Sequence, residues 1–132
     1  MAKKHYFLLI DTETTQTGKV ADFGAIVCDR KGNVLTSCAI LVRDFYSNPD
    51  AHPLFHIVGT TDATWSRAKL PARYARYNEM LAQGSRMLAS VAAVNNWLAK
   101  VAVQYAPTLT AYNIGFDAGV CDRTGINLDL FT

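Results

Sequence analysis

The clearest pattern in the chain is a series of apolar runs in its first third. The run from Tyr6 to Ile10 is continuously apolar, which predicts a strand buried on both faces and therefore central in a sheet. Two further runs, Val20–Asp29 and Val34–Val42, are rich in residues that favour strands, and the turn residues of Arg30–Asn33 separate them. The three runs therefore predict an antiparallel meander.

The middle of the chain is less regular. From Arg43 to Ser66 it is rich in small polar residues and proline, which predicts a long irregular connection. Helical character returns near Leu70–Pro71, where proline suits the first turn of a helix. A stronger helix is predicted from about Arg86 to Gln104, with Ser85 as its N-cap and Pro107 as its stop. Its apolar positions recur at steps of four and three: Met87, Val91, Val94, Leu98 and Val101.

The last third of the chain completes an α/β order. Thr108–Tyr112 predicts a short strand, a helix is expected from Phe116 or Asp117 to near Gly125, and Leu128–Phe131 forms an apolar stub. A helical crossover lets the fourth strand lie parallel to the first. Both strands would then end at the same edge of the sheet, which is where open α/β sheets bind ligands. We expect a single domain over residues 1–132.

Carboxylates follow both of these strands. If the first strand continues through Asp11 and Glu13, their side chains point to the same face, since residues two apart in a strand do so. Like charges this close disfavour each other unless a cation joins them, and Mg²⁺ or Mn²⁺ suits oxygen ligands. The spacing also fits two solvated carboxylates that open a loop. Asp117 also fits a helix N-terminal carboxylate, but the strand order brings it to the same edge.

The motifs around these carboxylates resemble those of the DnaQ-like (DEDD) 3′–5′ exonucleases. The first, Phe7–Thr15, is similar to a strand that ends in D-x-E-T-T, and the second, Ala111–Asp117, carries N-x-x-F-D. Between them, Asp22–Ile26 and Asp29–Val34 resemble the second strand of that family and the turn that follows it. The likeness follows the same order over most of the chain and weakens in the residues from Arg43 to Arg86.

The resemblance implies a ribonuclease H-like mixed sheet flanked by helices, and a two-metal phosphodiesterase acting on the 3′ end of single-stranded DNA or RNA. It implies that Asp11 and Glu13 hold one Mg²⁺ or Mn²⁺ ion, that Asp11 bridges to a second, and that Asp117 acts on the second through water. Phe116 would also pack under the site, and Asn113 would brace the turn or touch substrate. The residues implied to lie beside the substrate are Thr12, Thr14, Thr15, Asn113 and Phe116.

A third motif of that family, His or Tyr followed five residues later by Asp, has no counterpart after Asp117. It would supply a general base and a fourth carboxylate. Asp122 lies too near Asp117 in the same expected helix, and Asp129 lies in the terminal stub. Because Leu128–Phe131 resembles the start of a fifth strand, we expect a fragment or a naturally truncated form. The coding sequence downstream of Thr132 tests this expectation.

The composition of the chain limits the kinds of partner and the cellular compartment that can be expected. The chain has 132 residues, of which half are hydrophobic, and its formal charge of +2 permits a polyanionic partner without indicating one. Three widely spaced cysteines give neither a disulfide framework nor a zinc motif, so a reduced, cytoplasmic protein is expected. The first apolar run is shorter than a signal-peptide core, and no stretch is long enough to span a bilayer, so no membrane partner is expected.

A basic zone lies within the segment of weaker resemblance. It comprises Arg67, Lys69, Arg73, Arg76 and Arg86. Tyr74, Tyr77 and Leu81 fall on one helical face there, whereas Arg73 and Arg76 fall on another. The pattern favours a solvated basic face over a core stripe. The alternative is a surface that follows phosphates, with an aromatic ring that stacks on a base.

Three functions are compatible with these observations. The leading hypothesis is a metal-dependent 3′–5′ exonuclease. A second is a catalytically inactive module on the same fold that binds nucleic acid or protein, which the missing third motif favours. The weakest is a phosphotransferase with a strand-end aspartate as nucleophile, because such enzymes usually need a second aspartate where Glu13 stands.

Overall fold

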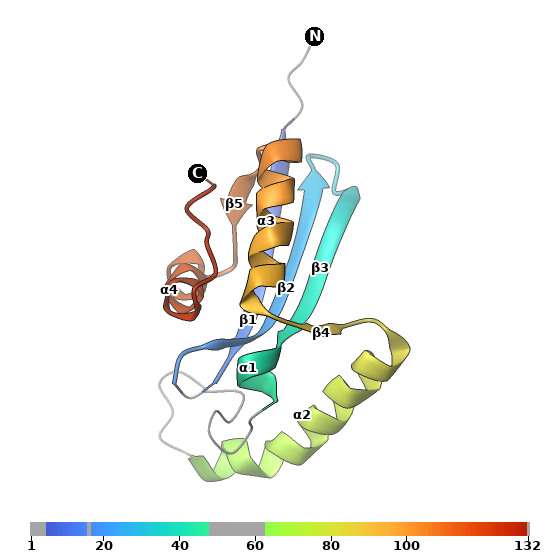
Figure 1. Cartoon of the computed structure of the whole chain (residues 1–132), viewed down its shortest axis with the longest axis vertical. Helices are drawn as coiled ribbons and strands as arrows, with labels where there is room; N and C mark the ends of the chain where they lie inside the picture. The colour runs from blue at the N-terminus through green and yellow to red at the C-terminus, as the bar shows by residue number, and fades with distance from the viewer. Residues whose placement is uncertain (1–4, 16, 48–62, 132) are drawn as a thin grey trace.

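The computed structural model describes residues 5–15, 17–47 and 63–131, with side chains from residue 72 onward in the last segment. The strands in this part of the chain form one five-stranded mixed sheet in the order β4-β3-β2-β1-β5 (Figure 1). Their bounds are Tyr6–Thr14 for β1, Val20–Asp29 for β2, Val34–Val42 for β3, Met87–Ala89 for β4 and Thr108–Thr110 for β5. Strands β1, β2 and β3 are antiparallel, whereas β5 runs parallel to β1 and β4 parallel to β3. The predicted meander and parallel fourth strand are confirmed.

Helices flank this sheet. Their bounds are Arg43–Tyr46 for α1, Ala63–Gln83 for α2, Val91–Tyr105 for α3 and Ile114–Thr124 for α4. In Figure 1, α3 crosses the front of the sheet, α4 lies beside the β5 edge, and α2 extends past the end of the sheet at which β1 finishes. None of the helices in the described ranges is long and apolar enough to cross a membrane.

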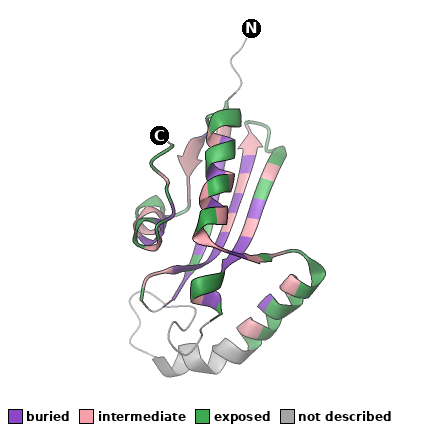
Figure 2. Ribbon diagram, viewed as in Figure 1, coloured by how far each residue is buried: buried purple, intermediate pink, exposed green. Residues whose placement is uncertain are grey.

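The main core lies between the sheet and helices α3 and α4. Val94, Leu98 and Val101 of α3 are buried against it, as the step of four and three predicted. Figure 2 shows the buried positions concentrated on the strands behind α3. A second, smaller cluster joins Tyr77 of α2 to Leu41 of β3 on the opposite face. The predicted aromatic stripe of α2 is therefore a packing surface.

Strand β1 is central but not buried on both faces, so that part of the prediction is wrong. Its residues alternate: Leu8 and Ile10 are buried in the main core, whereas Leu9 keeps 38% of its surface exposed. Helices α3 and α4 cover only one face of β1, and side chains alternate between the two faces of a strand. A continuous apolar run in the sequence does not show whether one or both faces of the strand are covered by helices.

The segment after β3 contains more helix than the sequence predicted. The short α1 follows β3 directly, and residues 48–62 of the expected connection lie outside the described part. Helix α2 begins at Ala63, so Pro71 lies inside it and not in its first turn. Proline removes one helical hydrogen bond without ending every helix. The prediction of a helix start near Leu70–Pro71 is therefore wrong.

The helix predicted from Arg86 to Gln104 begins later. Met87 and Leu88 belong to β4, where they pair with Ile40 and Leu41 of β3. Helix α3 begins after Ser90, whose hydroxyl oxygen accepts a hydrogen bond of 3.2 Å from the backbone N–H of Ala93. Ser90, and not Ser85, is therefore the N-cap.

Replacing Ser90 by alanine is expected to lower the free energy of unfolding by about 1 kcal/mol, because the backbone N–H of Ala93 loses its acceptor. Ser85→Ala is the matched control, since the exposed Ser85 hydroxyl donates only to the carbonyl of Met80. Urea denaturation of both variants measures the difference. A larger loss for Ser85→Ala than for Ser90→Ala would contradict the assigned cap.

The C-terminal part follows the prediction except at its end. Helix α4 runs from Ile114 to Thr124, two residues earlier at its start than expected, and ends at Gly125, which adopts a positive φ of 89°. Leu128–Phe131, expected to begin a fifth strand, instead forms a turn in which the N–H of Phe131 donates to the carbonyl of Leu128. This expectation of a strand is wrong.

Candidate functional site

The C-terminal half of β1 lies at an open edge of the sheet. Strand β2 pairs with β1 along its whole length, but β5 pairs only with Phe7 to Leu9 and ends opposite Leu9 at Thr110. The residues of β1 that follow, including Asp11 and Glu13, therefore extend beyond the end of β5. The chain turns there into α4, which fills the space beside this half of β1.

Asp117 of α4 contacts β1 between the other two carboxylates in sequence. The Thr12 hydroxyl donates a 2.7 Å hydrogen bond to Asp117 Oδ1, and the backbone N–H of Thr12 also donates to this carboxylate. Asp117 is only 6% exposed and Thr12 only 7%. The contact joins residues 105 positions apart, so the fold brings the ends of both motifs to the same edge.

Electrostatic effects connect the three carboxylates. The side chain of Glu13 reaches solvent but is partly desolvated, which raises its pKa, and Asp11 raises it further. Asp117 and Asp22 add to this rise, whereas Arg73 lowers the pKa of Glu13. Burial also raises the pKa of Asp117, the Thr12 hydroxyl opposes this, and Asp11 adds to it. Negative charge therefore accumulates at this edge.

A fourth carboxylate, Asp22 of β2, lies directly opposite Glu13 in the β1–β2 register. Its Oδ2 accepts a 2.8 Å hydrogen bond from the hydroxyl of Tyr77, and its Oδ1 lies 3.2 Å from Nη1 of Arg86. Burial raises the pKa of Asp22, and these two contacts partly offset the rise. Tyr77 and Arg86 thus attach α2 and the residues after it to the carboxylate edge.

The far end of α4 is also attached to the β1–β2 connection. The Thr124 hydroxyl accepts a 2.8 Å hydrogen bond from the backbone N–H of Val20, and Lys19 Nζ donates to the carbonyl of Arg123 at 2.6 Å. With the Asp117–Thr12 contact, α4 is held to the hairpin at both ends. This attachment fixes the approach of Asp117 to β1.

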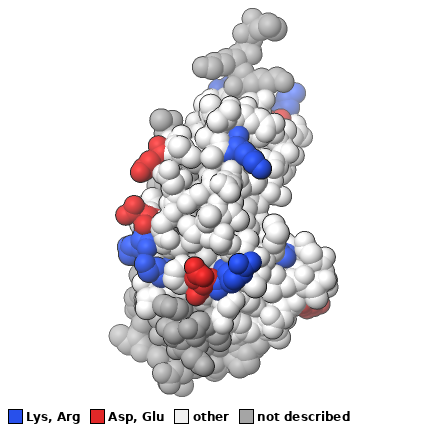
Figure 3. Space-filling view, viewed as in Figure 1, with Lys and Arg blue, Asp and Glu red and all other residues white. Residues whose placement is uncertain are grey.

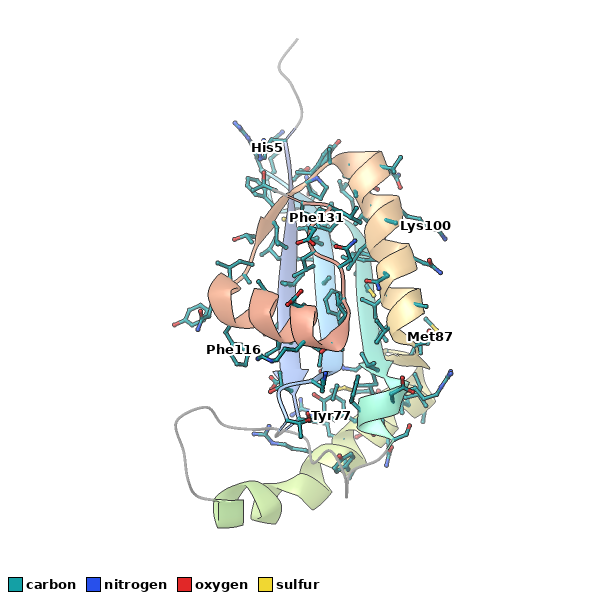
Figure 4. All side chains as sticks on the ribbon, turned by 60° about the vertical axis from the view of Figure 1, so that its left-hand side comes forward. His5, Tyr77, Met87, Lys100, Phe116 and Phe131 are labelled. Carbon is teal, nitrogen blue, oxygen red and sulfur yellow. The ribbon has the colours of Figure 1, made fainter. Side chains whose placement is uncertain are left out.

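The residues implied to contact substrate have different surroundings. The side chains of Thr12, Thr14 and Thr15 are buried, and the backbone N–H of Thr15 donates to the carbonyl of Lys19 at 2.9 Å. Asn113 is exposed before α4 and makes no side-chain capping bond, whereas Phe116 packs against the main core. Figure 4 shows Phe116 on α4 at the side of the sheet, above the end where Tyr77 lies.

The donor types at this edge fit a hard divalent cation, but a complete protein cage does not form. Among residues 5–15, 17–47 and 63–131, no three Asp, Glu, His or Cys side chains come close enough to hold a metal ion. Mg²⁺ usually keeps several waters and takes only one or two carboxylates directly, with substrate phosphates completing its shell. Asp11 and Glu13 are both exposed and lie two residues apart in β1, so they meet that lesser requirement.

Sequence reasoning missed the network of Asp22, Tyr77 and Arg86 around Glu13. One signal was present, because Asp22 is a charged residue inside the apolar run of β2, and a buried carboxylate needs partners. The identity of those partners could not be read from the sequence, since both come from a segment far along the chain.

The chain was compared with known proteins in three ways. No protein-family model matches it, and the searches of characterised proteins and of solved structures give no significant match. The geometry and the motifs are therefore the basis for any functional proposal.

Proposed function

We propose that this chain carries the metal-binding edge of a 3′–5′ exonuclease of the DnaQ-like type, on a ribonuclease H-like fold. The observation that carries the proposal is the hydrogen bond from the Thr12 hydroxyl to Asp117, which attaches the second motif to β1 at the residue between Asp11 and Glu13 in sequence. Because side chains alternate along a strand, this contact lies on the face of β1 opposite to Asp11 and Glu13. The five-stranded mixed sheet, with β5 parallel to β1, supports it further. The substrate class is the 3′ end of single-stranded DNA or RNA.

Asp11 and Glu13 would hold a Mg²⁺ or Mn²⁺ ion, and Asp117 would act on a second ion through water. Bound at this edge, the metal supplies an activated water and stabilises charge on the leaving oxygen. The two side chains suit this role because they share one face of β1 and remain exposed. Their mutual repulsion in the apo protein is relieved when a cation binds.

The protein's own residues would position the site. The Thr12 hydroxyl and N–H orient the Asp117 carboxylate toward the β1 edge. The buried Asp22, held by Tyr77 and Arg86, adds negative charge beside Glu13 without being free to turn toward a ligand. Because Asp22 and Asp117 are engaged in these contacts, Asp11 and Glu13 are the accessible carboxylates of the edge.

A catalytically inactive binding module on the same fold is the second candidate. It is favoured by the lack of a three-ligand group among the described side chains, and by the burial of the Asp117 side chain. In this case the chain would bind a nucleic-acid strand or a protein without cleaving it.

Addition of Mn²⁺ is expected to raise the melting temperature of the wild-type protein. An ion that binds only the folded state, present at 100 times its dissociation constant, stabilises that state by about 2.7 kcal/mol. The increase should be absent in Asp11→Ala, which removes an exposed ligand without creating a core cavity. Thermal denaturation over a series of Mn²⁺ concentrations measures the effect.

Two controls complete this experiment. Asp44→Ala removes another exposed carboxylate, on α1, and should retain the full response to Mn²⁺. Release of nucleotides from a 3′-labelled oligonucleotide then separates the two candidates. A Mn²⁺ response with cleavage supports the exonuclease, and the same response without cleavage supports the binding module. No Mn²⁺ response at all contradicts the proposed metal site.

A further inference from the structure

A pocket of about 310 Å³ lies next to the carboxylate edge, and among its lining residues Glu13 alone belongs to the proposed metal site. Its lining residues come from the end of β1, from α2 and from the turn that follows α2: Glu13, Arg73, Arg76, Tyr77, Met80 and Arg86. In Figure 4, Tyr77 lies between the lower end of the sheet and α2. Because Glu13 lines this arginine pocket and also belongs to the carboxylate edge, the two are continuous.

The charge of the arginine pocket is positive even after its internal pairs are counted. Three guanidinium groups line it, and two carboxylates interact with them: Glu13 with Arg73, and Asp22 with Arg86. Arg76 is exposed on α2. The three guanidinium groups therefore exceed the two carboxylates by one positive charge. On the face shown in Figure 3, Lys and Arg lie interspersed with Asp and Glu.

Arg86 provides a second, independent observation. Its side chain lines the arginine pocket, and its Nε is buried without a hydrogen-bond acceptor among the described residues. Buried donors in folded proteins nearly always have an acceptor. Asp22 Oδ1, which lies 3.2 Å from Nη1 of Arg86, is likewise buried without a hydrogen bond among the described residues, so this ion pair leaves hydrogen-bonding capacity of Arg86 unused beside the pocket. Guanidinium groups are well matched to phosphate oxygens, which accept two N–H groups at once.

We propose that the arginine pocket binds a backbone phosphodiester of a nucleic-acid strand whose 3′ end lies at the Asp11–Glu13–Asp117 edge. This assignment rests on the proposed function for the identity of the edge. The assignment also gives a path for the substrate, in which the nucleic-acid strand passes the end of β1 and follows α2. The arginines would hold the strand near the metal site but take no part in bond cleavage.

The pocket recognises phosphate and not a base. The Tyr77 ring is only 9% exposed, its hydroxyl donates to Asp22, and Arg86 lies 5.7 Å from its centre. A ring covered in this way offers no open surface on which a base can stack. Tyr77 is therefore excluded as the aromatic ring that stacks on a base. The arginines suit binding of the nucleic-acid backbone, which does not depend on base sequence.

The test measures binding in EDTA, so that it does not depend on the metal site. A 5′-fluorescein-labelled oligothymidylate is titrated with the full chain, and fluorescence anisotropy gives the dissociation constant. Arg76→Gln and Arg73→Gln should each weaken binding by about 3- to 10-fold and reduce the salt dependence by about 0.7 in the logarithmic slope. The variants Arg76→Lys and Arg73→Lys should bind more tightly than the glutamine variants because they keep the charge, but more weakly than the wild type because lysine lacks the paired N–H groups of a guanidinium.

Lys100→Gln is the matched control. Lys100 lies on α3 and points away from the sheet in Figure 4, so its loss should leave binding unchanged. Wild-type affinity in both arginine variants, or an equal loss in Lys100→Gln, would overturn the proposal. A thymidine 5′-monophosphate competitor that displaces the strand at equal concentration would also overturn it, because the pocket would then take a terminal phosphate.

The outcome is independent of the fate of the proposed function. If the arginine variants lose binding but the wild type releases no nucleotides with Mn²⁺, the arginine pocket stands and the exonuclease proposal fails. If nucleotides are released but the arginine variants bind like the wild type, the exonuclease proposal stands and the proposal for the arginine pocket fails. Melting temperatures of all variants confirm that each loss of binding occurs in a folded protein.

Discussion

Replacing Asp117 by asparagine is expected to lower Mn²⁺-dependent release of nucleotides from a 3′-labelled oligonucleotide by about 100-fold. The substitution keeps the size of the side chain but removes the negative charge of a carboxylate that interacts electrostatically with Asp11 and Glu13. The asparagine carbonyl can still accept the hydrogen bond from the Thr12 hydroxyl, so the position of α4 should be preserved. The loss of activity would therefore result from the missing charge of Asp117 and not from a change in the fold.

Asp122→Asn provides the matched control for this prediction. Asp122 lies on the same helix, is exposed, and has no contact with the carboxylate edge among the hydrogen bonds of the described residues. Its replacement should leave the rate of nucleotide release unchanged. Equal rates for the Asp117 and Asp122 variants, with an active wild type, would remove Asp117 from the site.

Replacing Leu98 by alanine is expected to lower the free energy of unfolding by about 3 kcal/mol. Leu98 is completely buried between α3 and the sheet, and it is among the largest side chains there. Its loss removes apolar contacts and leaves a cavity that close-packed neighbours fill only in part. A change of this size is a large fraction of the stability of a typical domain.

The control lies on the same helix. Val103 is 90% exposed, so Val103→Ala should change stability by less than about 0.5 kcal/mol. Urea denaturation at equal ionic strength gives both values. A small effect of Leu98→Ala would mean that α3 does not pack on the sheet as described, and a large effect of Val103→Ala would mean that its exposed face is covered in solution.

The strands of the meander were predictable because each is a long apolar run bounded by turn residues. Val20–Asp29 and Val34–Val42 were assigned with the observed bounds, and the parallel placement of Thr108–Thr110 followed from the crossover rule. Strand β4 was missed for a physical reason. Met87 fits the helical spacing that continues through Val91, and it belongs to a strand only because it pairs with β3.

The candidate site was predictable only in part. The sequence indicated that Asp11 and Glu13 share a face and that Asp117 reaches the same edge, because strand order and period determine both. It did not indicate that Asp117 would be buried against Thr12, since that contact depends on where β5 ends relative to β1. The surroundings of Asp22 depend on α2, whose start was placed too late.

The contacts that hold the carboxylate edge together join the two ends of the described chain. Thr12 meets Asp117 across 105 positions, and Val20 meets Thr124 across 104. During synthesis, β1 can pair with β2 early, but it must wait for nearly the whole chain before β5 and α4 arrive. Loop closure over such separations is slow compared with hairpin formation. A nascent chain would therefore contain Asp11 and Glu13 on a formed hairpin well before it could gather the third carboxylate.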